Sequence, residues 1–181
     1  NLAISFAQAG QRVLLIDGDM RRPGVHEIFK QAQEPGLSNL MVGHSSPSAT
    51  IRKSNVQGLW LLTAGRIPPN PAELLGSKRF KDFMGSLSEH FDSVIIDSPP
   101  IMAVTDAAIA ASSTNGIVFV VGAEMTSRQA ARAAVEQLEK SRPGFIGAVL
   151  NRVDLEGNGY YYAKYYRQEY GQYYQRAARS S

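Results

Sequence analysis

Two aspartates, Asp17 and Asp19, follow directly after the hydrophobic segment Val13–Ile16. Side chains two residues apart in an extended chain point to the same side, so both carboxylates would project together from the end of a strand. Oxygen ligands of this kind suit Mg²⁺, which binds through one or two carboxylates together with substrate phosphates. A solvated Asp-Gly-Asp turn would explain the same residues, and this motif alone does not choose between the two interpretations.

A second hydrophobic segment, Val94–Ile96, also ends in an aspartate, Asp97. This is the pattern of the Walker B motif, in which the carboxylate holds Mg²⁺ or its water shell. Many helix N-caps have the same local pattern. Two acidic strand ends in one sheet are harder to explain as caps, so the two segments together favour a cation and phosphate site.

A third segment, Ile146–Leu150, is followed by Asn151 and Arg152. The amide of asparagine offers both a donor and an acceptor, which suits the edge of a purine base. The pattern Asn-Arg-x-Asp is close to the Asn-Lys-x-Asp guanine signature of GTPases, and in related ATPases an asparagine at this place faces adenine. We therefore predict nucleotide contacts at Asn151 and Arg152, with an ordinary polar strand end as the alternative.

The phosphate-binding loop Gly-x-x-x-x-Gly-Lys-Ser/Thr is absent from the 181 residues. In domains that contain this loop, it normally lies between the first strand and the first helix. The chain opens at Asn1, and its first residues have the pattern of the middle of a helix that ends near Gly10. We therefore expect the sequence to be a piece of a longer protein that begins just after the loop. As it stands, this piece is expected to bind ATP poorly and to be inactive.

The elements that would position these residues alternate along the chain. Short aliphatic runs, typical of strands buried on both faces of a parallel sheet, occur at residues 13–16, 59–62, 94–96, 117–121 and 146–150. Helical patterns occur between them at residues 25–30, 37–42, 71–75, 78–91, 103–111 and 127–140. The order predicts a doubly wound, mainly parallel α/β sheet, with its ligand crevice beyond the carboxyl ends of the strands.

Two helix starts carry further signals. Thr126 with Gln129 resembles a capping box at the start of the helix over 127–140. Asp106 follows Thr105 at the start of the helix predicted over 103–111, where helix capping is the common explanation for such a pair. We expect Trp60 to pack in the core or at its rim.

Composition sets limits on the function. A length of 181 residues with 44% hydrophobic residues predicts a single core, and 19 basic against 16 acidic residues give 19 − 16 = +3, too little charge for a typical nucleic-acid protein. The lack of cysteine excludes disulfides, thiolate zinc sites and a cysteine nucleophile, and favours a reducing compartment. His26, His44 and His90 are scattered, so we predict no zinc site. No apolar run is long enough to span a bilayer.

The composition changes sharply near Glu156, which predicts a folded domain over residues 1–155 and a flexible tail over 156–181. All eight tyrosines lie in this tail: Tyr160, Tyr161, Tyr162, Tyr165, Tyr166, Tyr170, Tyr173 and Tyr174. They would serve as phosphoacceptors, pack as one face of a helix, or stack on single-stranded nucleic acid. The phosphoacceptor interpretation is preferred, and no nucleic-acid partner is expected.

Three motifs together resemble one family. They are Val13–Pro23 (VLLIDGDMRRP), Leu61–Leu75 (LLTAGRIPPNPAELL) and Val94–Pro100 (VIIDSPP), followed by the tyrosine cluster. In this combination the chain resembles, over nearly its whole length, the bacterial tyrosine kinases of exopolysaccharide and capsule assembly. The strand-end aspartates recur in P-loop ATPases that include partition and septum-site proteins, whereas the Pro-Pro-Asn-Pro stretch and the tyrosine tail are more specific.

The resemblance implies that the doubly wound, mainly parallel α/β sheet is of the P-loop NTPase type, and it implies roles for individual residues. Asp17 resembles the first aspartate of the Walker A′ motif, which helps to activate the attacking tyrosine hydroxyl and to order the magnesium shell, and Asp19 resembles its partner at the metal. Asp97 matches the Walker B carboxylate, and ATP and Mg²⁺ are the implied cofactors. Arg21 and Arg22 match a basic pair that contacts phosphate or a neighbouring subunit. Asp106 resembles a switch-region position, and Asn151 the residue near adenine.

The resemblance also implies partners and a location. We expect a cytoplasmic kinase at the inner face of the plasma membrane that phosphorylates tail tyrosines of neighbouring copies in a ring. A membrane-spanning chain-length regulator, fused or separate, would activate it, and a cognate tyrosine phosphatase would reverse the modification. The alternatives are a partition- or septum-site-type ATPase that switches on a membrane surface or DNA, and a non-catalytic interaction domain.

Overall fold

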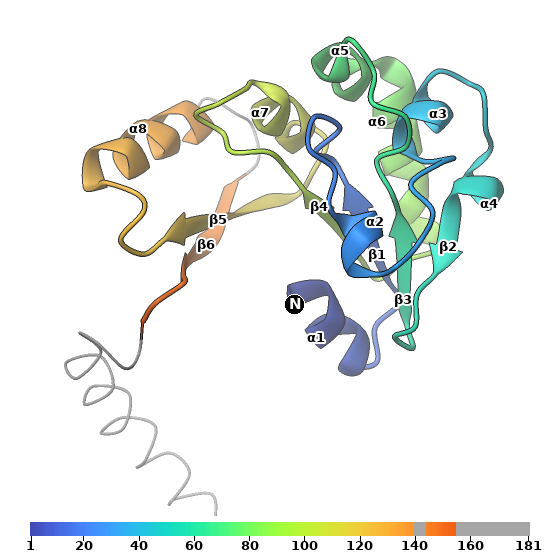
Figure 1. Cartoon of the computed structure of the whole chain (residues 1–181), viewed down its shortest axis with the longest axis horizontal. Coiled ribbons are helices and arrows are strands. Elements are labelled where there is room, and N and C mark those ends of the chain that lie inside the picture. The colour runs from blue at the N-terminus through green and yellow to red at the C-terminus, as the bar shows by residue number, and fades with distance from the viewer. Residues whose placement is uncertain (140–143, 155–181) are drawn as a thin grey trace, which may run out of the picture. The chain divides into compact units, whose positions relative to one another are not determined.

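A computed structural model describes residues 1–139 and 144–154 (Figure 1). The described residues form two compact units, one made of residues 1–117, 133–139 and 144 and the other of residues 118–132 and 145–154. The predicted tail and its boundary at residue 155 lie outside the described residues, so the division at 155/156 stays a prediction.

The first unit contains a four-stranded sheet whose strands lie in the order β2 (Ile51–Lys53), β3 (Leu59–Leu62), β1 (Val13–Asp17) and β4 (Ser93–Asp97). Strand β1 is central and runs parallel to both β3 and β4, while β2 is an antiparallel edge strand. The three predicted strands of this unit are confirmed. The sequence did not predict β2, because a three-residue strand with two basic residues lacks a hydrophobic pattern.

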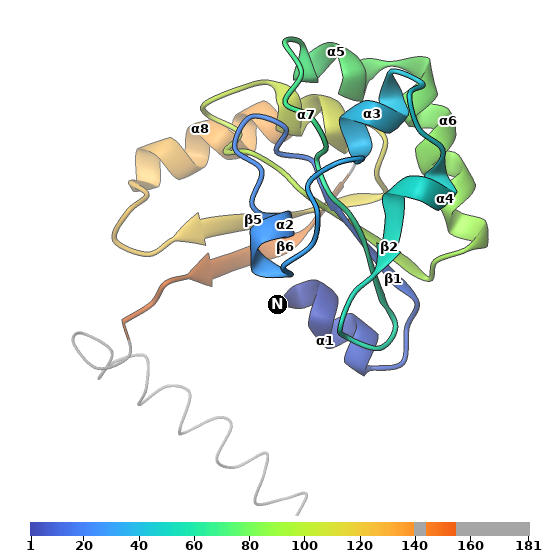
Figure 2. The same cartoon turned by 45° about the vertical axis from the view of Figure 1, so that its right-hand side comes forward.

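Helices follow or precede each strand of this unit, as both views show (Figures 1 and 2). They are α1 (Leu2–Gln8), α2 (Val25–Ile28), α3 (Leu37–Met41), α4 (Pro47–Thr50), α5 (Pro71–Gly76), α6 (Lys78–Ser86), the 3-10 helix η1 (Leu87–Glu89) and α7 (Asp106–Ala111). Three predicted helix boundaries were wrong. The helix expected over 25–30 ends at Ile28, the helix expected over 78–91 is α6 followed by η1 and ends at Glu89, and the helix expected over 103–111 begins only at Asp106.

The sheet is covered on both faces, which explains its continuous hydrophobic runs. Leu14, Ile16 and Leu62 point to the face packed by α3, α5 and α6. Val13, Leu59 and Leu61 point to the opposite face, where Ala3 and Ala7 of α1 and Val25 of α2 cover them. Alternate residues of each strand therefore enter different cores, and residues Val13–Ile16 of β1 are all apolar because both faces of the strand are covered.

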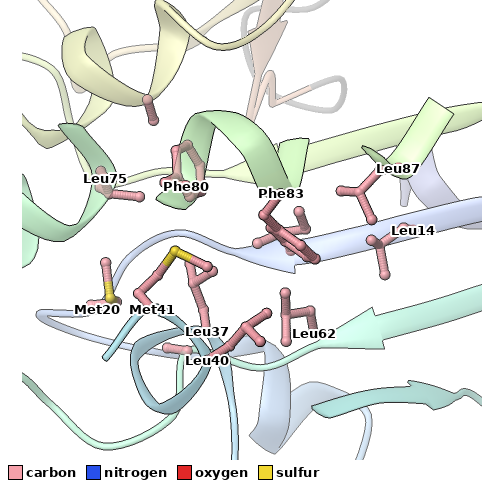
Figure 3. Packing of buried hydrophobic residues seen from close by; sticks show 13 residues of the cluster. Leu14, Met20, Leu37, Leu40, Met41, Leu62, Leu75, Phe80, Phe83 and Leu87 are labelled. Atoms are coloured by element: carbon pink, nitrogen blue, oxygen red, sulfur yellow. The ribbon is translucent and has the colours of Figure 1, made fainter. Parts of the chain in front are cut away.

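The larger core lies between the sheet and α6, as Figure 3 shows. Phe80 and Phe83 of α6 face Leu14 and Leu62 of the strands (Figure 3). Ser77 is the N-cap of helix α6, and its hydroxyl accepts a hydrogen bond from the Phe80 N–H at 3.1 Å. This cap fixes the start of the helix. Trp60 packs at the edge of this core with its ring 5.5 Å from that of Phe91, as expected.

The segment after β3 is held by close backbone contacts. Gly65 has a φ of +82°, and a Cβ atom there would lie 2.6 Å from both Asn39 Oδ1 and Ser38 Oγ. Asn39 Oδ1 accepts hydrogen bonds from the N–H groups of Gly36 and Arg66, and the Ser38 hydroxyl donates to the Arg66 carbonyl at 2.6 Å. These contacts give a physical reason for the Thr-Ala-Gly-Arg part of the Leu61–Leu75 motif.

The elements after α7 are β5 (Gly116–Gly122), α8 (Arg128–Glu139) and β6 (Gly144–Asn151). Strands β5 and β6 pair with each other in a two-stranded sheet, so the five predicted strands form two sheets rather than one. The predicted capping box is wrong by one residue, because Ser127 Oγ, not Thr126, accepts the hydrogen bond from the Ala130 N–H at 3.1 Å. No helix within residues 1–139 or 144–154 is both long and apolar enough to cross a bilayer.

Replacing Ile16 by alanine should lower the free energy of unfolding by about 2–5 kcal/mol, because its side chain is fully buried in the larger core. The matched control is Ile28→Ala, where the side chain is 76% exposed and the change should stay within about 0.5 kcal/mol. Urea unfolding followed by circular dichroism measures both variants. Equal losses in the two variants would contradict the core described above.

Candidate active site

The predicted aspartates Asp17 and Asp97 end neighbouring parallel strands. Strands β1 and β4 pair with Asp17 directly opposite Asp97, each at the carboxyl end of its strand. The carboxyl edge of a parallel sheet is where α/β folds bind ligands. The structure therefore brings together the two carboxylates that the sequence placed on separate strands 80 residues apart.

Gly18 holds the end of β1 against the end of β4. Its N–H donates a hydrogen bond to the Asp97 carbonyl at 2.7 Å. A Cβ atom at this position would lie 2.7 Å from that carbonyl oxygen and 2.8 Å from Ile96 Cγ2. The glycine between the two aspartates is therefore required by this close approach, which sets the spacing of the carboxylates on the two strands.

Asp17 is a buried carboxylate with one unpartnered oxygen. Its side chain is fully buried, and Oδ2 accepts hydrogen bonds from the N–H groups of Gly24 at 3.1 Å and Val25 at 3.0 Å. Oδ1 is buried and has no partner among the described residues. Burial raises the pKa of Asp17 because it disfavours the charged form, the N–H groups of Val25, Gly24 and, least of all, Asp19 lower it, and the negative charge of Asp97 raises it further.

Asp97 and Asp19 interact across the same edge. Asp97 is exposed at the end of β4, and its pKa is raised first by partial desolvation and then by the negative charge of Asp19. Asp19 Oδ1 accepts hydrogen bonds from the N–H groups of Arg21 at 3.1 Å and Arg22 at 2.9 Å. This turn fixes the Asp19 carboxylate close enough to Asp97 for repulsion, so a cation between them would be stabilised.

The residues present fit a magnesium-nucleotide site better than a metal centre made by protein alone. Within residues 1–139 and 144–154, no group of three or more His, Cys, Asp or Glu side chains has the arrangement of a metal centre. Mg²⁺ commonly uses only one or two carboxylates and takes its other ligands from water and phosphate. The buried, unpartnered Oδ1 of Asp17 and the mutual repulsion of the carboxylates are the features that such a group would relieve.

Arg21 is bound within its own subunit to Asp106. Its Nε donates to Asp106 Oδ2 at 2.8 Å and its Nη2 to Oδ1 at 3.1 Å, in a bidentate ion pair. Asp106 is fully buried at the first position of α7. The capping interpretation was wrong, because Thr105 makes no capping hydrogen bond and the Asp106 carboxylate binds a guanidinium. An acidic residue opening the apolar helix DAAIAA was the only sequence signal of this partnership.

Asn151 and Arg152 lie in the second unit. Asn151 ends β6, is exposed, and accepts a hydrogen bond through Oδ1 from the Arg152 N–H at 2.9 Å. Arg152 has a φ of 60° and donates from Nη1 to Met125 Sδ at 3.1 Å. Their contact with a nucleotide stays a prediction.

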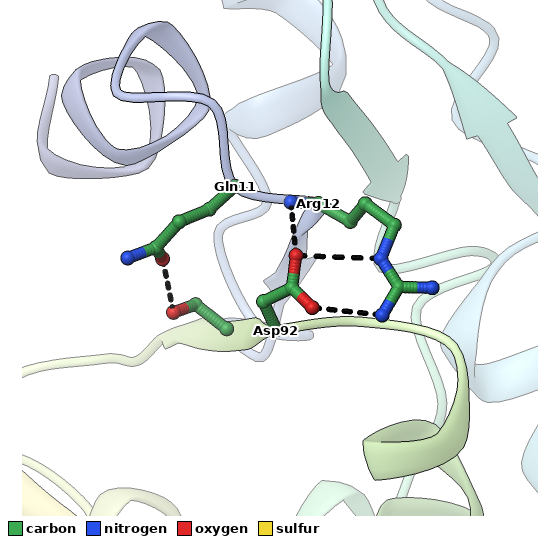
Figure 4. A network of polar contacts seen from close by, with 4 residues as sticks. Gln11, Arg12 and Asp92 are labelled. Carbon is green, nitrogen blue, oxygen red and sulfur yellow. Dashed lines mark hydrogen bonds and ion pairs between the residues drawn. The ribbon is translucent and has the colours of Figure 1, made fainter.

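A second bidentate pair joins the other ends of β1 and β4. Arg12, just before β1, donates from Nη2 to Asp92 Oδ1 at 2.7 Å and from Nε to Oδ2 at 3.3 Å, and its N–H donates to Oδ2 at 2.8 Å (Figure 4). Beside it the Ser93 hydroxyl donates to Gln11 Oε1 at 2.6 Å. The hydrogen bonds from Arg12 lower the pKa of Asp92. The sequence did not predict this pair.

Comparison with known proteins defines the class first. Residues 1–142 match the family model described as an AAA domain. The structure of the cell division ATPase MinD of Pyrococcus furiosus superposes with a TM-score of 0.70 at 19% identity, covering 86% of this chain and 65% of that one. This likeness shows the P-loop NTPase fold, as predicted.

Closer relatives define the family within that class. The putative tyrosine-protein kinase CapB of Staphylococcus aureus is 41% identical over 165 residues, which cover 91% of this chain and 72% of CapB. The tyrosine-protein kinase ptk of Acinetobacter johnsonii is 37% identical over 88% of this chain, but over only 22% of its own, much longer, chain. The chain belongs to the family of bacterial tyrosine-protein kinases.

Solved structures agree with this assignment. The kinase domain of the Escherichia coli tyrosine kinase ETK superposes with a TM-score of 0.83 at 33% identity, covering 87% of this chain and 62% of that one. The chimerical protein CapA2B2 superposes with a TM-score of 0.82 at 38% identity, covering 84% of this chain and 68% of that one. Identity to the kinases is therefore well above identity to MinD, which makes the partition-type alternative the weaker one.

Replacing Gly18 by alanine should destabilise the protein by about 1–3 kcal/mol, because the new methyl group would overlap the Asp97 carbonyl and the Ile96 side chain. Gly85 in α6 is the control, since no atom lies within 4 Å of a Cβ built there. Gly85→Ala should stabilise the helix by about 0.5–1 kcal/mol. Urea unfolding gives both values, and a neutral Gly18→Ala would show that the two strand ends are not in close contact.

Replacing Asp17 by asparagine should raise the melting temperature at neutral pH. Because the native pKa of Asp17 is raised, the native state binds more protons than the unfolded state, so the wild type loses stability as pH rises from the ordinary value of 3.8 through the native pKa. The gain in melting temperature of Asp17→Asn over the wild type should therefore vanish below about pH 3.8 and grow above it.

Thermal melts at pH steps from 3 to 8 measure this difference. Asp82→Asn is the matched control, because its carboxylate is 61% exposed on α6 and pairs with Lys78 at 2.6 Å. That variant should show no gain that grows with pH. An Asp17→Asn protein that is less stable than the wild type across the whole range would contradict the buried, repelled carboxylate described here.

Proposed function

We propose that this chain is the catalytic part of an ATP- and Mg²⁺-dependent protein-tyrosine autokinase. The observation that carries the proposal is the pairing of Asp17 with Asp97 at the carboxyl ends of adjacent strands, with Asp17 Oδ1 buried and unpartnered. The 41% identity to a putative tyrosine-protein kinase supplies the reaction class.

Asp19 and Asp97 are the proposed holders of Mg²⁺, with Asp17 completing its shell. Asp97 ends β4 and is exposed, and the half-buried Asp19 lies two residues after the end of β1. The repulsion between them that raises the pKa of Asp97 would be removed by a divalent cation. When bound, Mg²⁺ and ATP supply the phosphoryl group and neutralise the charge on its oxygens. Phosphoryl transfer then depends mainly on positioning, which the rigid ends of β1 and β4 provide.

Asp17 is the proposed general base. Tyrosine has an ordinary pKa near 10 and is a weak nucleophile at neutral pH, so it gains from a carboxylate that accepts its proton. The raised pKa of Asp17 makes it a stronger base than an exposed aspartate, and Oδ1 is the oxygen that has no hydrogen bond to lose. As the tyrosine Oη forms its bond to the γ-phosphorus, its proton passes to Asp17 Oδ1, the bond from that phosphorus to the β–γ bridging oxygen breaks, and ADP leaves.

The proposed acceptors are the tail tyrosines of a neighbouring copy: Tyr160, Tyr161, Tyr162, Tyr165, Tyr166, Tyr170, Tyr173 and Tyr174. Each phosphate would add about −1.5 to −2 charges, so several modified tyrosines would reverse the local positive balance and repel neighbouring tails in a ring. Asn151 and Arg152 are the proposed contacts of the nucleotide base.

The setting follows from the family resemblance. We place the kinase in the cytoplasm at the inner face of the plasma membrane, where a chain-length regulator, fused or separate, would activate it in exopolysaccharide or capsule export and a tyrosine phosphatase would reset it. The much greater length of ptk, of which this chain matches 22%, supports a fused form in some relatives.

The test is phosphotyrosine mapping by mass spectrometry on the protein as its gene encodes it, incubated with Mg-ATP. Asp17→Asn should lower the rate of tail phosphorylation by about 10²–10⁴-fold through loss of the base. The exposed control Asp82→Asn should stay within about twofold of wild type, because Asp82 lies on the outer face of α6.

Mixing two variants separates transfer between copies from transfer within one. Asp17→Asn protein with an intact tail is combined with wild-type protein whose tail tyrosines are phenylalanine, and phosphate should appear on the Asp17→Asn tail. ATP hydrolysis without any phosphotyrosine would instead support the partition-type alternative and refute the kinase proposal.

A further inference from the structure

The Arg21–Asp106 pair joins the two segments that follow the strand-end carboxylates Asp17 and Asp97. Arg21 lies two residues after Asp19 in the loop that follows β1, and Asp106 opens α7 in the segment that follows β4 and Asp97. The two residues are separated by 85 positions and both belong to the first unit. The pair is therefore a direct side-chain connection between the segments after the two catalytic strands.

The geometry of the pair is that of a fixed contact rather than a loose surface ion pair. Asp106 is fully buried, and both of its oxygens accept from the guanidinium fork of Arg21, at 2.8 and 3.1 Å. A buried carboxylate left without this partner would be strongly destabilised. The Arg21 side chain, 44% exposed, is thus held at its end by a rigid helix start.

Arg21 also contacts Asp19, one of the proposed Mg²⁺ ligands, through its backbone N–H. The Arg21 N–H donates to Asp19 Oδ1 at 3.1 Å, next to the bond from Arg22 N–H. Two residues further on, Gly24 and Val25 donate to Asp17 Oδ2. Fixing the Arg21 side chain therefore fixes the stretch of backbone that orients both Asp19 and Asp17.

From this connection we propose that Arg21 and Asp106 are positioning residues, which hold the loop after β1 so that Asp17 and Asp19 stay aligned with Asp97. This assigns Arg21 a role inside its own subunit, in place of the phosphate or neighbouring-subunit contact expected from the sequence. The catalytic consequence rests on the proposed kinase function, whereas the holding of the loop does not.

The first experiment measures loop order without any reaction. Hydrogen exchange of the amides of residues 21, 22, 24 and 25 is compared in wild type, Asp106→Asn and Arg21→Ala, because these amides bond to Asp19 and Asp17. We expect exchange about tenfold faster or more in both variants. Unchanged protection of these four amides would overturn the proposal.

The Arg12–Asp92 pair is the matched control. It is also a bidentate arginine–aspartate pair and joins the same two strands, but at their opposite ends (Figure 4). Arg12→Ala and Asp92→Asn should lower the melting temperature yet leave the protection of the amides of residues 21, 22, 24 and 25 as in wild type. Equal loosening of this loop by both pairs would show a general loss of stability and would also overturn the proposal.

The second experiment measures kinetics of tail phosphorylation in the protein as its gene encodes it. A misplacement of about 1 Å costs on the order of 100-fold in rate, so Arg21→Ala and Asp106→Asn should each lower kcat by about 10–100-fold with KM for ATP changed by less than about threefold. The double variant should be no slower than the slower single variant, because both remove one contact. Arg12→Ala should keep kcat within about twofold at a temperature where it is folded.

The two experiments separate the proposals. Faster loop exchange with normal kcat would refute the positioning role while leaving the kinase function intact. A wild-type protein that forms no phosphotyrosine would refute the proposed function, and the exchange data alone would then decide whether the pair holds the loop. If the losses of kcat in Arg21→Ala and Asp106→Asn multiply in the double variant, the two residues do not act through one shared contact, and the proposal is contradicted.

Discussion

The register between β1 and β4 is the constraint on which the site depends. It sets Asp17 opposite Asp97, and the hydrogen bond from the Gly18 N–H to the Asp97 carbonyl, at 2.7 Å, leaves no room for a side chain between the strands. Carboxylates on separate segments of chain are thereby fixed by backbone geometry rather than by flexible side chains. A slip of one residue would turn the side chains of β1 to the opposite faces and end this arrangement.

The rest of the first unit supports that register. Alternate residues of β1 enter two different cores, so its position is specified on both faces. Bidentate arginine–aspartate pairs join the segments before the strands and the segments after them. The site lowers the stability of the fold. Asp17 is buried with an unpartnered oxygen and lies near the negative charge of Asp97, which is unfavourable unless a cation binds or a carboxylate is protonated. Apolar packing on both sides of the sheet offsets that penalty, which is the usual relation between stability and function at active sites.

Much of this arrangement was predictable from the sequence, for identifiable reasons. The aliphatic runs of β1, β3 and β4 have the length and continuity of strands buried on both faces, and parallel strands must bring the aspartates at the ends of β1 and β4 to one edge of the sheet.

The sequence does not predict the three-residue edge strand β2, because two of its three residues are basic and it has no hydrophobic pattern. The partnership of Arg21 with Asp106 spans 85 residues and depends on how the loops fold back, which local pattern does not encode. The sequence instead favours a helix cap at Asp106, because local capping is the commoner role for an acidic residue at a helix start. The tyrosine tail and the contacts of Asn151 with a nucleotide base stay predictions.

The most direct measurement of the central claim is the position of a manganese ion in crystals of the gene-encoded protein grown with ADP and Mn²⁺, located by anomalous scattering. The account predicts a peak at the carboxyl edge of β1 and β4, about 2 Å from a carboxylate oxygen of Asp17, Asp19 or Asp97, or about 4 Å away through one water. A nucleotide-bound manganese ion lying more than about 8 Å from all three carboxylates, beyond reach through a single water, would contradict it.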